Sequence, residues 1–193
     1  MSDTVNFRCE CGQVSGTVPA NGLHIRCGCD SCRVAELYLD QPDPGPKGIS
    51  VYQILPQAIT FEKGQDQLAL MQVTPKGAFR WYARCCKTSL FSTATKPGLN
   101  YAALKGGAVA EADAIGSPVA SVYLKDASGH ERHSGMLRII TNVLRSVLAR
   151  VLAGDKSTPF FDDAGAPVSE RQLMPKDMRT ELLARVRSNT LGT

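Results

Sequence analysis

The 193-residue sequence predicts a mainly β fold followed by a helical C-terminal segment. Residues 5 to about 125 form short runs of β-branched and aromatic residues separated by turn residues, a pattern typical of short strands. Residues 136–152 instead place their apolar residues at helical spacing. We therefore predict a β domain over residues 1–130, with a helical C-terminal extension over residues 131–193 packed on it.

Nine segments carry the strand pattern, in the order VNFRC (5–9), GQVSGTV (12–18), LHIRC (23–27), SVYQIL (50–55), AITFE (58–62), LALMQV (68–73), AFRWYA (78–83), YAAL (101–104) and ASVYL (120–124). The connections between them are rich in Asn, Gly and Pro, as in QPDPGPKG at 41–48 and TPKG at 74–77. These residues favour turns and loops. The alternation predicts a small all-β domain.

Helical spacing begins at Met136. The apolar residues that recur at this spacing are Met136, Leu137, Ile139, Ile140, Val143, Leu144, Val147, Leu148, Val151 and Leu152. Gly154 is typical of a helix end, and a last amphipathic helix is expected near 176–187. We expect the apolar face of the helix at 136–152 to pack on the β domain or on a second copy, as a homodimer. A membrane surface or a partner's groove is the alternative, but the rest of the chain carries no lipid signal.

Composition and charge exclude several classes of protein. Hydrophobic residues make up 43% of the chain and charged residues 21%, which excludes wholesale disorder. The net charge of +4 is split evenly between the two halves of the chain, so we expect no nucleic-acid surface. No apolar run reaches the roughly 18 residues that span a bilayer. The first ten residues lack the pattern of a secretory signal, so we expect no membrane insertion and a cytoplasmic location.

Seven cysteines occur in three short groups: Cys9 and Cys11; Cys27, Cys29 and Cys32; and Cys85 and Cys86. An odd number of cysteines without an export signal does not fit a disulfide framework. Cysteines two apart in sequence also rarely reach disulfide geometry. The clusters indicate a metal site, and the alternative is seven thiols without a ligand role.

Zinc suits this set of ligands. Structural zinc sites use four protein ligands, whereas catalytic sites use three and keep one position open. Cys27, Cys29 and Cys32 supply three thiolates from one loop, which leaves Cys9, Cys11 and the Cys85–Cys86 pair for a second ion. Gly12 would ease the turn after Cys11. One or two zinc ions are expected, with one open and one closed site.

Histidines are the next candidate ligands. His24 precedes the three-cysteine loop by three residues and could reach that site as a ligand or proton carrier. His130 and His133 are expected on an exposed loop.

Other residues near the cysteines have simpler interpretations. Asp30 either orients a bound water or stabilises a turn, and the turn is favoured. Arg33 and Arg84 flank the thiolates and would offset their negative charge, which also suits an anionic thiol substrate. Trp81 and Tyr82 are expected in the core and on a sheet face.

Three stretches, FRCECGQVSGTV, IRCGCDSCR and FRWYARCCKTSLF, resemble the glutathione-dependent formaldehyde-activating enzyme family. They are most similar to a branch that carries an R-W-Y-A-x-C-C element. The resemblance covers about residues 5–100 and implies a β-tent fold of small antiparallel sheets joined by zinc. It implies structural zinc ligands at Cys9, Cys11 and Cys86. It also implies a second zinc at Cys27, Cys29 and Cys32, the catalytic residues, near which glutathione and formaldehyde combine.

Cys85 departs from the family pattern. The family's motif is C-x-x-C-G-T, and its first cysteine aligns with Ala83, while Cys85 is extra. Adjacent residues of an extended segment point to opposite sides. Either the segment turns sharply and both cysteines join the first site, or Cys85 faces the three-cysteine loop and closes it.

Two functions are consistent with these residues. The first is a carbon–sulfur lyase activity that joins a thiol such as glutathione to a small aldehyde. The second is a non-catalytic, zinc-stabilised binding module in which both metal sites are closed and the helix at 136–152 meets a partner. The fourth ligand of the Cys27, Cys29 and Cys32 site distinguishes them.

Overall fold

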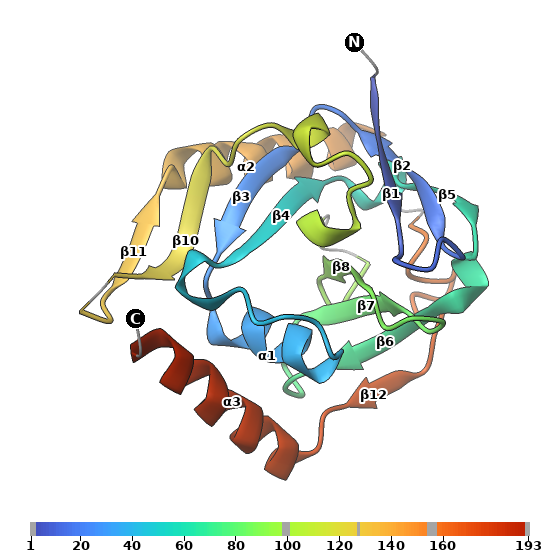
Figure 1. Ribbon diagram of the computed structural model, residues 1–193. Helices are drawn as coiled ribbons and strands as arrows, with labels where there is room; N and C mark the ends of the chain where they lie inside the picture. Colours follow the sequence, from blue (N-terminus) through green and yellow to red (C-terminus); the bar gives the residue numbers. More distant parts are fainter. Residues whose placement is uncertain (1–2, 98–100, 127, 154–157, 192–193) are drawn as a thin grey trace.

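Two β-sheets and three α-helices make up the computed structural model of the chain, which describes residues 3–97, 101–126, 128–153 and 158–191 (Figure 1). The small sheet has the order β1-β2-β5, with β1 at Thr4–Arg8, β2 at Ser15–Pro19 and β5 at Thr60–Lys63. Its ladders are antiparallel.

The large sheet has the strand order β11-β10-β3-β4-β9-β8-β7-β6-β12. Its strands are β3 (Leu23–Cys27), β4 (Ile49–Ile54), β6 (Leu68–Gln72), β7 (Phe79–Ala83), β8 (Ser89–Thr93), β9 (Ala102–Lys105), β10 (Ala120–Lys125), β11 (Glu131–Ser134) and β12 (Arg171–Leu173). The pairs β10–β3 and β12–β6 are parallel and the other pairs are antiparallel. In Figure 1 the small sheet lies on the right and β10 and β11 lie on the left.

An aromatic core joins the two sheets. In β1 every second residue is buried, so that Val5 and Phe7 face inward, as alternation along a strand requires. Phe7 meets Phe91 of β8 edge to face, with ring centroids 5.0 Å apart. Trp81 of β7 packs at 5.0 Å on Phe160, so the segment after α2 returns to complete the core. A Cβ at Gly16 would lie 2.0 Å from the carbonyl oxygen of Thr60, so glycine permits the close contact of β2 with β5.

Helix α1 (Asp30–Tyr38) and helix α3 (Lys176–Leu191) pack together below the large sheet in Figure 1. Their shared apolar cluster contains Val34, Ala35, Leu37, Met71, Val73, Met174 and Val186. Two polar contacts tie the end of α3 to the region around α1. Arg187 Nε lies 3.4 Å from Asp30, and Asn189 donates to Asp43 at 3.1 Å. The C-terminal helix therefore covers the helix that follows the three-cysteine loop.

Helix α2 (Met136–Ala153) crosses behind β3 in Figure 1 and contacts β10. Ile139 packs against a buried cluster that includes Cys32. Seven other apolar residues of the helix are exposed: Met136, Leu137, Ile140, Val143, Leu144, Val147 and Leu148. No helix in the described part of the chain is both long and apolar enough to cross a membrane. Gly154, the expected stop of this helix, lies outside the described residues.

The predicted mainly β fold with C-terminal helices is confirmed. All nine predicted strand segments overlap observed strands, and the two predicted helices occur at Met136–Ala153 and Lys176–Leu191. Helix α1 and strands β8, β11 and β12 were not predicted from the sequence. Strands β11 and β12, together with Phe160, show that the chain after residue 130 contributes strands and core residues as well as helices.

Candidate metal centres

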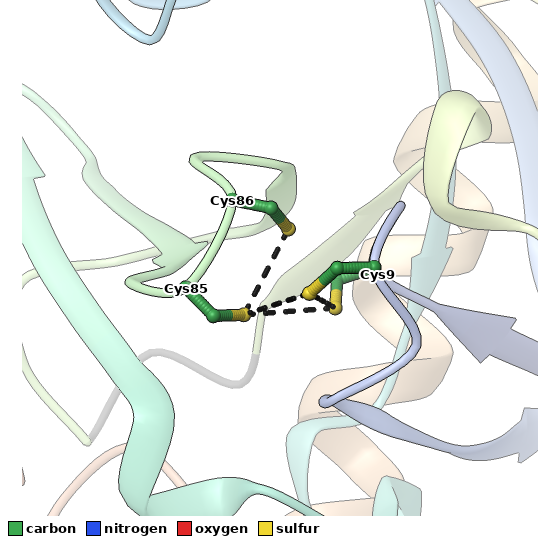
Figure 2. A group of neighbouring side chains, drawn as sticks. Cys9, Cys85 and Cys86 are labelled. Atoms are coloured by element: carbon green, nitrogen blue, oxygen red, sulfur yellow. Dashed lines mark hydrogen bonds between the residues drawn. The ribbon is translucent and has the colours of Figure 1, made fainter.

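Four cysteines converge where the end of β1 meets the turn after β7. The Sγ atoms of Cys9, Cys11, Cys85 and Cys86 all lie within 4.8 Å of one another, and we call them the four-thiol group. Adjacent pairs are 3.6 Å (Cys9–Cys11), 3.2 Å (Cys11–Cys85) and 3.8 Å (Cys85–Cys86) apart. Figure 2 shows the side chains of Cys85 and Cys86 turned toward Cys9. The group could hold a metal ion.

A tight turn places the first two of these thiols. Gly12 has φ +72° and its N–H donates to the carbonyl of Cys9 at 3.0 Å, which bends the chain just after Cys11. The N–H of Val14 donates to Cys9 Sγ at 3.2 Å and so stabilises negative charge on that sulfur. The predicted role of Gly12 is confirmed.

A second turn places Cys85 and Cys86 on the same side. Lys87 has φ +59°, and its N–H donates to the carbonyl of Ala83 at 2.8 Å. Because the segment turns rather than extends, both sulfurs face Cys9. Of the two arrangements considered for Cys85, the structure has the first, with Cys85 in the four-thiol group and apart from the three-cysteine loop.

Hydrogen bonds favour the thiolate form of Cys86. Burial raises the pKa of Cys86, but bonds with the Thr88 hydroxyl and with the backbone N–H of Cys11 outweigh it and lower the pKa to about 6. The pKa of Cys85 is raised, because burial and the neighbouring thiols both oppose its ionisation. Four thiols this close together do not all ionise unless a cation lies between them. A bound metal ion would supply that positive charge.

The second cluster, which we call the three-thiol group, consists of Cys27, Cys29 and Cys32. Cys27 ends β3, Cys29 immediately precedes α1, and Cys32 lies in the first turn of α1. Cys27 Sγ lies 3.5 Å from Cys29 Sγ and 3.7 Å from Cys32 Sγ. Among the histidines, cysteines and carboxylates that the structure describes, no fourth one joins this group.

Two buried cations stabilise the three-thiol group. The pKa of Cys32 is lowered by hydrogen bonds with Cys27 and Cys29, which outweigh burial, and further by the charges of Arg80 and Lys105. Hydrogen bonds with Cys29 and Cys32, together with burial, raise the pKa of Cys27. Arg80 is 7% exposed and Lys105 3% exposed, so their charges act in a poorly solvated interior. Arg80 also donates to Ser92 at 2.7 Å.

Both groups fit zinc. A tetrahedral zinc ion with Zn–S bonds of about 2.3 Å would separate its sulfur ligands by about 3.8 Å. The closest Sγ separations are 3.2 to 3.9 Å in the four-thiol group and 3.5 to 3.7 Å in the three-thiol group. The four-thiol group has the ligand number of a structural site, and the three-thiol group has that of an open one.

The histidines lie outside both groups. His24 bonds at both ring nitrogens, with Nδ1 2.7 Å from the Gly116 carbonyl and Nε2 2.7 Å from the Ser50 hydroxyl. Those bonds occupy the atoms that would bind metal, so the hypothesis of His24 as a ligand is wrong. His130 and His133 are both exposed, as expected; His130 lies in the turn between β10 and β11, whereas His133 lies in strand β11 and not in a loop.

Asp30 begins α1 and lies 3.1 Å from Lys125 Nζ, an ion pair that the sequence did not indicate. The guanidinium of Arg33, which was expected to offset the charge of the thiolates, forms two bonds with the Asp43 carboxylate, at 2.8 and 2.7 Å. Arg84 is exposed.

Arg80 and Lys105 belong to the surroundings of the three-thiol group, although the sequence did not single them out. In the sequence, both residues could only be placed in predicted strands that end at a turn, and nothing there indicated a position beside the thiols. Trp81 is fully buried and Tyr82 partly buried, in agreement with the prediction.

The model of a family of unknown function, DUF6151, matches residues 1–171. The chain belongs to this family. The matched range holds all seven cysteines and both cations of the three-thiol group. A search of the curated proteins finds no match to the chain.

Proposed function

We propose that this DUF6151 protein holds a structural zinc ion in the four-thiol group and a reactive zinc ion in the three-thiol group. The reactive site would join a small thiol such as glutathione to a small aldehyde, a carbon–sulfur lyase-type activity. The resemblance to the glutathione-dependent formaldehyde-activating enzymes motivates the choice of substrates.

The position of Cys85 is the observation that carries this proposal. Its sulfur lies 3.2 Å from Cys11 and 3.9 Å from Cys9, so the fourth thiolate is used in the four-thiol group. The three-thiol group keeps three protein ligands among the described residues. A metal site with three protein ligands leaves a position for an exogenous molecule.

The chemistry needs a thiolate and a polarised carbonyl. A zinc ion, when bound, supplies Lewis acidity and lowers the pKa of a thiol that joins its ligands. The thiol loses its proton to water, a carbon–sulfur bond forms as the carbonyl π bond breaks, and the oxygen takes up a proton from water. Arg80 and Lys105 offset the negative charge that the three thiolates and an incoming thiolate bring together.

Cobalt substitution tests the open position. The protein is loaded with Co(II), and the thiolate-to-cobalt absorption bands are recorded as glutathione is added. We expect the bands to change, and the Cys32→Ser protein to lose the change. Cys11→Ser protein, altered in the other group, should retain it if soluble. An unchanged spectrum at millimolar glutathione would contradict the proposal, because it would show a complete coordination sphere.

Activity is measured separately. Glutathione and formaldehyde should form their hemithioacetal adduct faster with the zinc protein than in buffer alone, and Cys32→Ser should remove the acceleration. No acceleration, together with unresponsive cobalt bands, would favour the second function, a zinc-stabilised binding module. The exposed apolar face of α2 is the feature that supports that alternative.

A further inference from the structure

A small cavity lies against β4, the strand that pairs with the Cys27 end of β3. It has a volume of about 240 Å³, and we call it the Lys105 cavity. Its lining residues include Glu36, Ile49, Ser89, Lys105 and Gly107. Ile49 pairs with Cys27 in the β3–β4 ladder, so one wall of the cavity is the strand next to the first thiol.

Lys105 is placed between the cavity and the thiols by strand geometry. Alternate residues of a strand share a face, so Lys105 lies on the same side of β9 as Ala103. Ala103 belongs to the buried cluster that contains Cys32. The effect of the Lys105 charge on Cys32 agrees with this placement.

The ammonium of Lys105 forms an ion pair with Glu36 but makes no hydrogen bond with the described residues. Its Nζ is buried. Its nearest carboxylate oxygen is Glu36 Oε1, at 3.4 Å, and this oxygen already accepts a hydrogen bond from Ser89 at 3.0 Å. An ammonium has three donors, and buried donors are almost always satisfied by protein, water or ligand. The cavity is therefore built to receive an oxygen atom.

The charges around the cavity decide whether a charged or an uncharged oxygen acceptor would bind there. The Glu36 carboxylate and the nearby thiolates would repel a carboxylate or a phosphate. With a divalent ion in the three-thiol group, the charges of the thiolates, the ion, Arg80, Lys105 and Glu36 cancel. An uncharged carbonyl oxygen is the acceptor that fits this balance, and Ile49 with the neighbouring prolines offers apolar surface for a short carbon chain.

We propose that the Lys105 cavity is the aldehyde-binding pocket of the three-thiol site, and that Lys105 Nζ donates a hydrogen bond to the carbonyl oxygen. This inference rests on the proposed function and adds to it the residue that binds the second substrate. Donation from an ammonium stabilises the negative charge that develops on the oxygen as sulfur adds to carbon. The proposal involves no covalent bond to Lys105, which acts only as a hydrogen-bond donor and lies 3.4 Å from the Glu36 carboxylate.

The binding test uses acetone, a carbonyl compound that does not readily add thiols, with acetate and inorganic phosphate as charged probes. Each is titrated into ¹⁵N-labelled zinc protein while the backbone amide signals are followed by NMR. We expect acetone to shift the signals of Gly107 and Ser89, with an affinity in about the millimolar range for so small a ligand. Acetate and phosphate should not shift them.

Lys105→Met removes the donor and keeps a chain of similar length. We expect it to weaken acetone binding about tenfold or more, the effect of losing a hydrogen bond from a charged donor. Lys76→Met is the matched control, because Lys76 is an exposed lysine in the turn between β6 and β7 and lies outside the cavity lining. Should Lys105→Met not fold with Glu36 unpaired, the double variant Lys105→Met with Glu36→Gln removes both charges.

A third variant leaves both charges in place. A Cβ at Gly107 would meet no atom within 4 Å, so Gly107→Leu can extend into open space at the cavity wall. It should abolish the acetone shifts, and Gly107→Ala should preserve them.

Three results would overturn the inference. Acetone could fail to shift the cavity amides, Lys105→Met could bind it as well as the unaltered protein, or acetate could bind more tightly than acetone. The cobalt experiment with glutathione separates this failure from that of the proposed function. Responsive cobalt bands without acetone binding would reject the Lys105 pocket alone, whereas acetone binding with unresponsive bands would reject the open metal site.

Discussion

The four-thiol and three-thiol groups use the same side chain in different surroundings. Cys11 and Cys85 are exposed, so water screens the charge of the four-thiol group. Cys32 is buried, and the three-thiol group instead relies on two interior cations, Arg80 and Lys105. The comparison shows two ways to stabilise the negative charge of clustered thiolates: by solvent in the four-thiol group and by fixed cations in the three-thiol group. One of these cations, Lys105, also lines a cavity and makes no hydrogen bond with the described residues.

The two groups also connect different parts of the chain. The four-thiol group joins the segment that follows β1 to the turn between β7 and β8, and Cys9 and Cys85 are 76 positions apart in the sequence. The three-thiol group lies within six consecutive residues, Cys27 to Cys32. Metal in the first would close a long loop, whereas metal in the second would secure one short turn. The first should therefore matter more for folding.

The largest expected effect comes from removing a ligand of the four-thiol group. Cys11 is exposed, so Cys11→Ser costs little packing and reports ligand loss. We expect a loss of several kcal/mol in the free energy of unfolding, or insoluble protein, because structural zinc binding contributes directly to folding. Thermal unfolding and zinc analysis measure this. Cys11→His, which restores a zinc ligand, should recover part of the stability.

Cys27→Ser is the matching change in the three-thiol group, and it should destabilise the fold less. Greater damage from Cys27→Ser than from Cys11→Ser would reverse the roles that we assign to the two groups. Zinc at more than one equivalent per chain is expected in the unaltered protein. Iron with visible absorption would indicate an iron–sulfur cluster instead.

The next effect concerns the support of α1, which carries Cys32. Asp43 holds the buried Arg33 of this helix through two hydrogen bonds. Asp43→Asn removes the carboxylate charge that faces this buried guanidinium, and we expect a cost of about 3–5 kcal/mol in the free energy of unfolding. Chemical denaturation measures it. Asp126→Asn, at the exposed β10–β11 hairpin, is the control and should cost much less.

The same carboxylate predicts a pH dependence. Burial of Asp43 favours its neutral form, but hydrogen bonds from Arg33 and Asn189 outweigh this and lower its pKa. A lowered pKa in the folded state means that the unfolded chain binds the proton more tightly. The stabilisation is therefore present above pH of about 4 and is lost as the pH falls below that value. Asp43→Asn should flatten the acid limb of the stability curve, and an unchanged limb would assign the dependence to other carboxylates.

A smaller difference is expected in the accessibility of the thiols. In metal-free protein, iodoacetamide should label the exposed Cys11 several-fold faster than Cys32, because burial keeps the reagent from Cys32 even though the pKa of that thiol is lowered. Mass spectrometry of the peptides gives the rates. Equal rates would show that the three-thiol group opens when metal is removed.

The smallest effect on the free energy of unfolding is expected from a substitution on the exposed face of α2, away from both metal groups. Leu144 is 63% exposed, so Leu144→Asp should change the free energy of unfolding by about 0.5 kcal/mol or less. The homodimer through α2 remains a prediction. Light scattering should find a dimer for the unaltered protein and a monomer for Leu144→Asp. A monomer in both would mean that the prediction of a homodimer is wrong.

Several features of the fold could be read from the sequence because their causes are local. Strand β1 alternates polar and apolar residues, and α2 repeats its apolar residues at helical spacing, so both were predicted correctly. Strand β8, with the sequence SLFST, was missed because its two large apolar residues are adjacent and stand among Ser and Thr residues, which are buried through pairing with β7 and β9. Helix α1 was missed because it is short and contains Arg33 and Glu36, whose buried positions depend on Asp43 and Ser89.

The sequence by itself determined which thiols are candidate ligands and that the chain turns after Cys11, because that turn is set by a few consecutive peptide units and by Gly12. Only the tertiary structure decided that Cys85 joins Cys9 and Cys11, because that choice depends on the turn at Lys87 and on contacts between segments far apart in sequence. Strand pairing alone brings Arg80 and Lys105, on β7 and β9, beside the same thiols. Long-range register sets that convergence, and no local pattern in the sequence encodes it.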